Sequence, residues 1–146
     1  MFNEDGEYGS IIELDAVGTD VQAYMGTGEV TVAGGGITYT SVHYGFKIIR
    51  ASSGTTTLQA TNAGGSETAT DTGLTVTTGQ LYMLSAKKIG STITYYVDNV
   101  LKATHTTNIP TGSENVLIQH AISNVGVATN SNLKTSFSSF RFKGSA

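Results

Sequence analysis

One stretch of the chain alternates apolar and polar residues on both sides of a turn signal. Apolar Ile93, Tyr95 and Val97 are separated by more polar residues, a period of two that is typical of a strand with one buried face. Asp98-Asn99 follows, and both residues tolerate the positive φ of a tight hairpin turn. A second strand is expected over residues 100–106. The sequence therefore predicts a β-hairpin.

The register of this hairpin decides which side chains are buried. A two-residue loop would pair Tyr95 with Lys102, whereas a three-residue loop that includes Val100 would pair Tyr95 with Ala103. A slip of one residue moves every side chain to the other face. The second register sorts apolar from polar residues more cleanly, so we expect a bulged turn. It would place one set inward, Ile93, Tyr95, Val97, Leu101 and Ala103, and another outward, Thr94, Tyr96, Lys102 and Thr104.

The composition indicates that the rest of the chain is also made of β-strands. The 146 residues suffice for one domain with a single core, and we expect residues 1–146 to form one domain with a loose arm at 1–8. Thr makes up about one residue in six and Gly occurs 18 times, while no window has helical periodicity. Short strands between closely spaced turn signals predict an all-β, two-sheet antiparallel sandwich.

The expected strands can be placed along the chain. They cover residues 9–16, 21–25, 29–33, 37–42, 44–51, 55–61, 67–70, 73–76, 81–89, 92–97, 100–106, 116–122 and 133–142. Residues 37–51 could form one long strand bent at Gly45. We expect Tyr82, Leu84 and Ala86 to be buried, and a bulge near Ser138-Ser139.

Several of these segments resemble one family. The matching segments are Tyr44–Arg50, Thr57–Ala60, Thr72–Leu84, the hairpin and Thr135–Lys143. Together they resemble concanavalin A-like (laminin G-type) jelly-roll domains, particularly those of bacteriophage structural and fibre proteins. Asn99 stands where the family usually has Gly, and Tyr82 where an indole is common.

The resemblance implies a jelly-roll sandwich that acts without catalysis. It implies a structural or adhesion module of a virion: a head decoration protein, a head fibre or a tail-fibre domain. Such a module would dock on copies of itself or on a capsid or tail scaffold. It would reside in the virion, assembled in the cytoplasm of the bacterial host, or otherwise at an extracellular surface.

An enzymatic role is disfavoured by one incomplete motif. Glu13-Leu-Asp15 resembles the start of the E-x-D-x-E motif of laminarinase-like glucanases, in which two carboxylates act as nucleophile and acid/base. Val17 occupies the third acidic position. We therefore expect no catalytic residues, and interpret Glu13 and Asp15 as surface residues beside a strand.

Metal and cofactor sites are also disfavoured. His43, His105 and His120 are too far apart for a zinc motif, and the chain has no cysteine. Calcium candidates are the pairs Asp15 with Asp20 and Glu67 with Asp71, but two carboxylates supply too few of the six to eight oxygens that calcium takes. We expect no cofactor.

The charge of the chain limits the classes of partner that we expect it to bind. The net charge is −3 and the eight Lys and Arg are scattered, so we expect no nucleic-acid binding, which needs a basic stripe. No long apolar run is present, and we expect no membrane partner. The acidic first seven residues do not resemble a secretory signal.

Carbohydrate binding is the alternative function. A sugar site pairs an aromatic ring with nearby hydroxyl and amide groups, which Thr94, Tyr96, Lys102 and Gln119 would provide. Tyr96 would otherwise pack under a neighbouring strand or subunit. We keep a carbohydrate-binding module as the second hypothesis beside protein docking.

Overall fold

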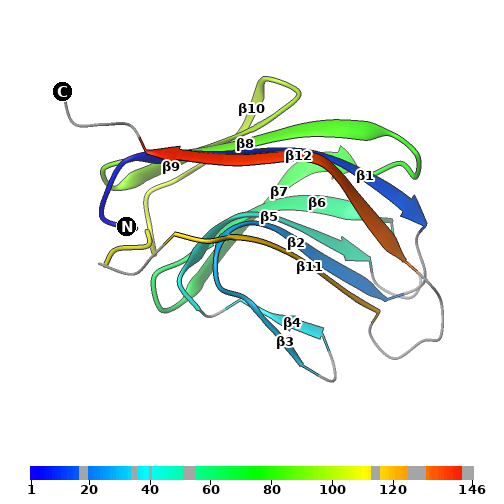
Figure 1. Ribbon diagram of the computed structural model, residues 1–146, viewed down its shortest axis with the longest axis horizontal. Coiled ribbons are helices and arrows are strands. Elements are labelled where there is room, and N and C mark those ends of the chain that lie inside the picture. Colours follow the sequence, from blue (N-terminus) through cyan, green and yellow to red (C-terminus); the bar gives the residue numbers. More distant parts are fainter. Residues whose placement is uncertain are drawn as a thin grey trace.

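Two antiparallel β-sheets lie face to face (Figure 1). The computed structural model describes residues 1–16, 20–33, 36–39, 41–50, 55–112, 116–124 and 131–142. Sheet A contains, in spatial order, β10 (Val100–His105), β9 (Thr92–Val97), β8 (Leu81–Ile89), β1 (Gly6–Ala16) and β12 (Asn132–Phe142). Sheet B contains β11 (Ile118–Asn124), β2 (Val21–Gly28), β5 (His43–Arg50), β6 (Thr57–Ala63) and β7 (Glu67–Thr75). The fold is thus an all-β two-sheet sandwich.

The core fills the space between the sheets. In β1, Tyr8, Ile12 and Leu14 are completely buried because alternate residues of a strand point to the same face. Rings from both sheets meet there, with Phe46 of β5 and Tyr95 of β9 packed edge to face at 5.6 Å between centroids. The prediction for β8 is confirmed, since Tyr82, Leu84 and Ala86 are all buried.

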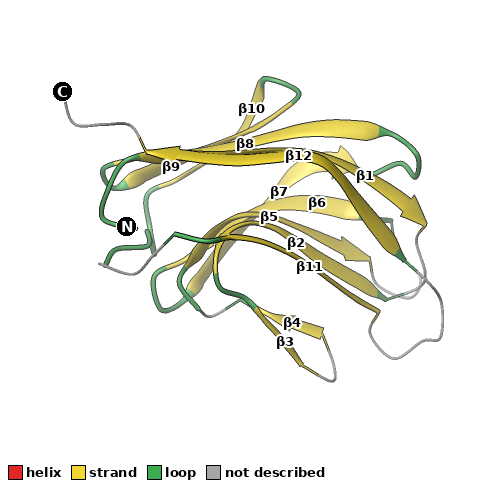
Figure 2. Ribbon diagram, viewed as in Figure 1, coloured by secondary structure: helices red, strands yellow, loops and turns green. Residues whose placement is uncertain are grey.

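A small hairpin covers part of the outer side of sheet B. It consists of β3 (Thr31–Ala33) and β4 (Gly36–Thr38), and lies on the side of sheet B away from sheet A (Figure 1). Val30, Ile37 and Tyr39 pack there against Tyr24 of β2. Every regular element in the described ranges is a strand (Figure 2). Accordingly, this part of the chain has no helix long and apolar enough to cross a membrane.

The hairpin of β9 and β10 forms as predicted, with one difference in its turn. Asp98 and Asn99 have φ of 51° and 65°, so they alone make the loop, and Val97 pairs with Val100. Tyr95 nevertheless pairs with Ala103, because a bulge follows between Leu101 and Ala103. The pairing was predicted correctly, but a three-residue loop is wrong.

The bulge changes the position of one side chain. Leu101 was expected inward, yet it is 54% exposed, because it pairs with the outward-facing Tyr96 before the register shifts. The remaining inward residues of the hairpin are buried as predicted: Ile93, Tyr95, Val97 and Ala103.

Residues 1–8 do not form a loose arm. Phe2 is buried and packs edge to face on Tyr44, and Tyr8 is completely buried within β1. The acidic, polar start of the chain suggested an arm, but β1 is paired on both sides, with β8 and with β12. These non-local pairs hold the start of the chain in sheet A.

Other features of the strands also differ from expectation. In place of one long strand over residues 37–51, the structure has β4, which ends at Thr38, and β5, which begins at His43, and Gly45 pairs regularly with Gly26 and Thr61 with no bulge. Residues 67–76 give one strand, β7, with a register shift instead of a break. The bulge in β12 lies at Ser136, because Ile11 pairs with Phe137 and Ile12 with Thr135.

Candidate functional site

The residues proposed for a sugar site are only partly brought together. Thr94 and Tyr96 are half-buried on the outer face of sheet A, the face turned away from sheet B. Lys102 lies at the bulge of the neighbouring strand β10. Gln119 lies in the other sheet, on β11, where its amide binds the backbone N and O of Val30 at 2.6 and 3.0 Å. Gln119 is therefore a structural residue, and the four do not form one site.

The outer face of sheet A is organised in rows across the three adjacent strands β12, β1 and β8. The Ile11 row contains Phe137, Ile11 and Met83, and the Gly9 row contains Ser139, Gly9 and Ser85. The Glu7 row lies beyond the Gly9 row and contains Arg141, Glu7 and Lys87. The Glu13 row lies beyond the Ile11 row and contains Lys134, Glu13 and Leu81. Each row is given from β12 through β1 to β8.

The Ile11 row leaves apolar side chains in water. Phe137 is 57% exposed and Met83 39%, and Leu81 of the adjacent row is also exposed. Leu101 of β10, which pairs with the outward-facing Tyr96, extends the exposed apolar surface toward the edge of the sheet. Single exposed apolar residues are ordinary, but several on one sheet face indicate a binding surface.

A groove of about 290 Å³ lies beside this row. Its floor contains Gly9, which has no side chain to fill the space between Ser85 and Ser139. The groove is lined by Glu7, Gly9, Ser10, Ile11, Met83, Leu84, Ser85, Asn99 and Phe137. An apolar ridge and an open groove therefore lie side by side on one face.

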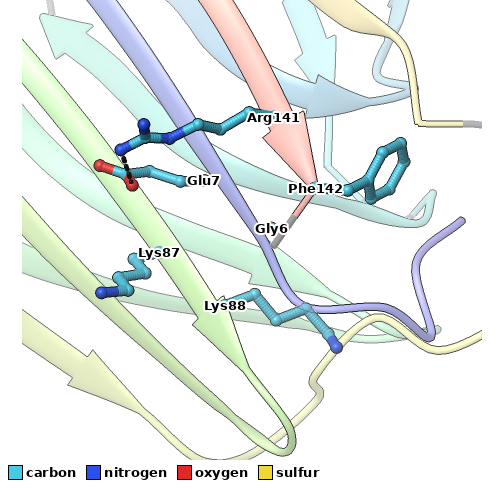
Figure 3. Close-up of a pocket in the computed structure, with 6 residues that line it drawn as sticks. All are labelled: Gly6, Glu7, Lys87, Lys88, Arg141 and Phe142. Carbon is cyan, nitrogen blue, oxygen red and sulfur yellow. Dashed lines mark hydrogen bonds and ion pairs between the residues drawn. The ribbon is translucent and has the colours of Figure 1, made fainter. Parts of the chain in front are cut away.

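A second groove of about 270 Å³ adjoins the first at Glu7 (Figure 3). Arg141 Nη2 lies 3.0 Å from Glu7 Oε2, and Ser85 Oγ donates to Glu7 Oε1 at 3.2 Å. Figure 3 shows the side chains of Lys87 and Lys88 pointing in opposite directions, as successive strand residues do. Lys88 is buried, which lowers its pKa, and its Nζ donates to Glu4 O at 3.4 Å.

The two carboxylates of the incomplete hydrolase motif share one cation. Lys134 Nζ lies 3.0 Å from Asp15 Oδ2 and 3.7 Å from Glu13 Oε1. The hydrogen bond with Asp15 raises the pKa of Lys134. Val17 lies outside the described residues. Both carboxylates are thus bound to an ammonium group.

The three histidines lie in separate parts of the sandwich. Burial lowers the pKa of His43, His105 and His120. Each is hydrogen-bonded within the fold: His43 to Ser41 O and Thr61 Oγ1, His105 to Asn62 Oδ1 and Thr70 Oγ1, and His120 to Tyr8 Oη, Thr135 Oγ1 and Ser138 Oγ. Their bonding partners identify them as parts of buried polar networks.

The calcium candidates are also engaged with protein groups. Glu67 Oε1 accepts from Thr61 Oγ1 at 2.7 Å and pairs with the Lys47 ammonium at 2.5 Å. Asp71 Oδ1 accepts from the backbone N of Gly73 at 2.8 Å. Within the described ranges, no three His, Asp or Glu side chains gather in a way that could hold a metal ion.

Comparison with known proteins gives a fold and no family. No protein-family model and no curated protein matches the sequence. Solved structures do match, among them the polysaccharide lyase family 18 protein aly-SJ02, with a TM-score of 0.57 and 9% identity over 99% of this chain and 74% of that one. The chain has a concanavalin A-like jelly-roll fold.

Two further structures give the same result. The family 7 alginate lyase AlyA1 from Zobellia galactanivorans has a TM-score of 0.58 and 10% identity, over 96% of this chain and 62% of that one. The alginate lyase from Alteromonas sp. 272 has a TM-score of 0.57 and 8% identity, over 99% of this chain and 74% of that one. At these identities the likeness is one of fold, and function depends on this chain's own residues.

Proposed function

We propose that the chain is a non-catalytic docking module that binds through the outer face of sheet A. The observation that carries this proposal is the exposed apolar Ile11 row, with Leu81 beside it. Burying such side chains against a partner removes apolar surface from water, the main favourable term in protein association. Aliphatic and Met side chains suit a protein surface better than a sugar ring.

The absence of catalysis is part of this proposal. Glu13 and Asp15 are bound to Lys134, and His43, His105 and His120 are held in internal hydrogen bonds. A general base needs a free lone pair within reach of a substrate proton. We expect no unsaturated product when the protein is incubated with alginate, the polymer named for its structural neighbours. Absorbance of that product would contradict this part of the proposal.

A virion is the assembly in which we would look for this module first. The support is the resemblance of the hairpin and its neighbouring segments to phage structural and fibre domains. A head decoration protein or a fibre domain works by burying surface against a scaffold or against further copies. The outer face of sheet A, with five strands, would serve either role.

Carbohydrate binding by the same face is the second candidate. The groove over Gly9 offers Phe137 for stacking, with Ser85, Asn99 and Glu7 as hydrogen-bonding groups. Tyr96 of β9 pairs with Ser85 and so continues the Gly9 row. Shallow grooves with an aromatic side chain and a few polar groups suit a sugar. The fold shared with polysaccharide lyases adds support by analogy alone.

Binding measurements on matched variants test docking against sugar recognition. Wild type, Met83→Glu and Val32→Glu would be immobilised through a cysteine introduced at Ala69, which is exposed on β7. Each would be probed with free protein, disassembled tailed-phage virions and an oligosaccharide panel. We expect Met83→Glu to weaken protein binding at least about tenfold, because it places a charge in the buried centre of the interface. Val32 is exposed on β3, outside this face, so Val32→Glu should bind normally.

The outcomes separate the two candidates. Saturable sugar binding that Tyr96→Ala removes without unfolding the protein would favour the carbohydrate-binding module. If Met83→Glu binds every ligand as wild type does, the outer face of sheet A is not the docking surface.

A further inference from the structure

We propose that the occupant of this face is a second copy of the same chain, packed sheet to sheet about a two-fold axis. The inference rests on the proposed docking function and adds the partner and its orientation. A face-to-face dimer of this kind is isologous, so the same patch must fit itself. Two features of the outer face of sheet A meet that requirement: the arrangement of ridge and groove, and the distribution of charge.

The Ile11 row, which forms the ridge, and the Gly9 row, which forms the groove floor, are adjacent on the outer face of sheet A. Ser10 lies midway along β1 between the Ile11 and Gly9 rows, and its own side chain is buried. A two-fold axis in the plane of the interface, across the strands at Ser10, lays each strand over the same strand of the second copy. The Ile11 row of one copy then lies on the Gly9 row of the other. Phe137 lies over Ser139, Ile11 over Gly9 and Met83 over Ser85.

The same axis brings the Glu7 row over the Glu13 row. Arg141 and Lys87 with Glu7 give two cations and one anion, a net +1, whereas Glu13 and Asp15 with Lys134 give a net −1. The two ends of the face are therefore opposite in charge. With the strands of the two copies fully aligned, this axis would place Glu7 over the second copy's Glu13 and Arg141 over its Lys134, which are pairs of like charge. The opposite net charges of the two ends therefore meet only when the two sheets cross at an angle.

The angle at which two packed sheets cross decides which charged residues of the two copies meet. Aligned sheets cross at about 30°, and the charged rows lie three residues, about 10 Å, from the axis. The crossing therefore displaces the charged rows of one copy sideways relative to those of the other by about 5 Å, close to one strand spacing. One sense of crossing brings Lys87 onto the second copy's Glu13 and Glu7 onto its Lys134. The other sense brings Arg141 onto its Glu13. Either sense joins opposite charges.

The available area is of the size that a stable dimer uses. Sheet A has five strands, and its central strand β8 has nine residues. At strand spacings of about 4.8 Å and a rise of about 3.3 Å per residue, the face covers about 700 Å². Specific interfaces bury about 800 Å² on each partner. Exposed Leu101, which shares the outer face with Tyr96 at the β10 edge, adds apolar contact.

Filling the groove tests the inference without damaging the fold. A Cβ at Gly9 would lie 3.7 Å from Ser139 Oγ and 3.9 Å from Leu84 O, which are ordinary contacts, and Val suits a strand. Gly9→Val should therefore fold, with a Tm no lower than that of wild type at a protein concentration at which wild type is monomeric. It should raise the dimer dissociation constant, measured by sedimentation equilibrium, at least about tenfold, because its side chain occupies the place of Ile11. Ala69→Val, on exposed β7, is the matched control and should leave that constant unchanged.

A charge exchange tests the orientation. Lys87→Glu makes both ends of the face negative and should weaken the dimer, while Lys87→Glu combined with Glu13→Lys restores opposite ends and should recover it. A wild-type protein that stays monomeric at all concentrations would overturn the inference, as would an oligomer that Gly9→Val leaves intact. Neither result would refute the docking function, which fails only if Met83→Glu has no effect on binding to any partner.

Discussion

Two facing glycines make room for the hydroxyl of Tyr24. Tyr24 is completely buried on the outer side of sheet B, and its Oη donates to Thr27 O at 2.8 Å and Tyr44 O at 3.2 Å. To reach these carbonyls the side chain crosses Gly26, which pairs with Gly45 of β5. A Cβ on Gly26 would lie 2.6 Å from Tyr44 O and 2.8 Å from Gly45 Cα. Both contacts are with backbone, which cannot move aside cheaply.

Gly26→Ala should therefore destabilise the protein by about 1–3 kcal/mol, the usual range for overpacking a well-packed site. Denaturant unfolding at pH 7.5 measures this free energy. Gly9→Ala, measured at a protein concentration at which wild type is monomeric, is the matched control, since its Cβ meets only ordinary contacts. Equal stability of the two variants would show that β2 and β5 can separate to admit the methyl group.

Two glutamine side chains hold the β3–β4 hairpin on sheet B. Gln119 of β11 binds both backbone groups of Val30, at 2.6 and 3.0 Å. Gln22 of β2 accepts from the backbone N of Ile37 at 2.6 Å. Each amide supplies the hydrogen bonds that a neighbouring strand would otherwise give to this short element, which could not be stable alone.

Gln119→Leu should loosen this hairpin while leaving the two sheets intact. Loss of two partly buried hydrogen bonds costs about 1–3 kcal/mol, enough to raise the exchange rate of the Val30 amide at least about fivefold if that amide exchanges by local opening. Hydrogen exchange followed by NMR measures this rate. Gln59→Leu, at a half-buried position of β6 in the same sheet, should leave it unchanged. Equal rates in both variants would argue that apolar packing alone holds the hairpin.

The elements that local sequence predicts best are those with local partners. The limits of β8, Leu81–Ile89, match the prediction, and the β9–β10 hairpin has the predicted pairing of Tyr95 with Ala103. Period-two alternation and the Asp98-Asn99 turn suffice there. The Leu101 bulge was missed because two positive-φ residues close the loop and the register shifts only afterwards.

The candidate site could not be found in the same way. It depends on β1 lying between β8 and β12, which joins Gly9 to Ser85 and to Ser139, about 75 and 130 residues away in sequence. No local pattern encodes such a pairing. One signal was present: Gly9 begins an alternation in which Ile11 and Glu13 share its face. The proposed Gln119 was misplaced because β11 belongs to the opposite sheet.

At the scale of the whole molecule, the three histidines are distributed over both sheets. His43 lies on β5, His105 on β10 and His120 on β11. His105 bonds to Asn62 of β6 and His120 to Tyr8 of β1, so these two residues connect sheet A to sheet B. Burial lowers the pKa of all three. A proton added to any of them must enter a site that already uses both ring nitrogens.

The sandwich should therefore lose stability as the pH falls below about 6.5, the ordinary pKa of histidine. Because the folded pKa values are lowered, the unfolded chain binds more protons in this window. The stabilisation is complete above the unfolded pKa and is lost as the pH falls through the folded values. Each histidine contributes a slope of at most about 1.4 kcal/mol per pH unit, and solvent screening reduces it for half-buried His120.

Urea unfolding at pH 7.5 and pH 5.0 measures this loss, and staying at or above pH 5.0 limits the contribution of the carboxyl groups. His105→Asn removes one titrating ring and should flatten the dependence relative to wild type, even though it lowers stability at both pH values. If wild type unfolds with the same free energy at pH 7.5 and pH 5.0, these histidines accept protons without opening the contacts between the sheets. Those contacts would then be maintained by the apolar core and by the tyrosine and asparagine hydrogen bonds alone.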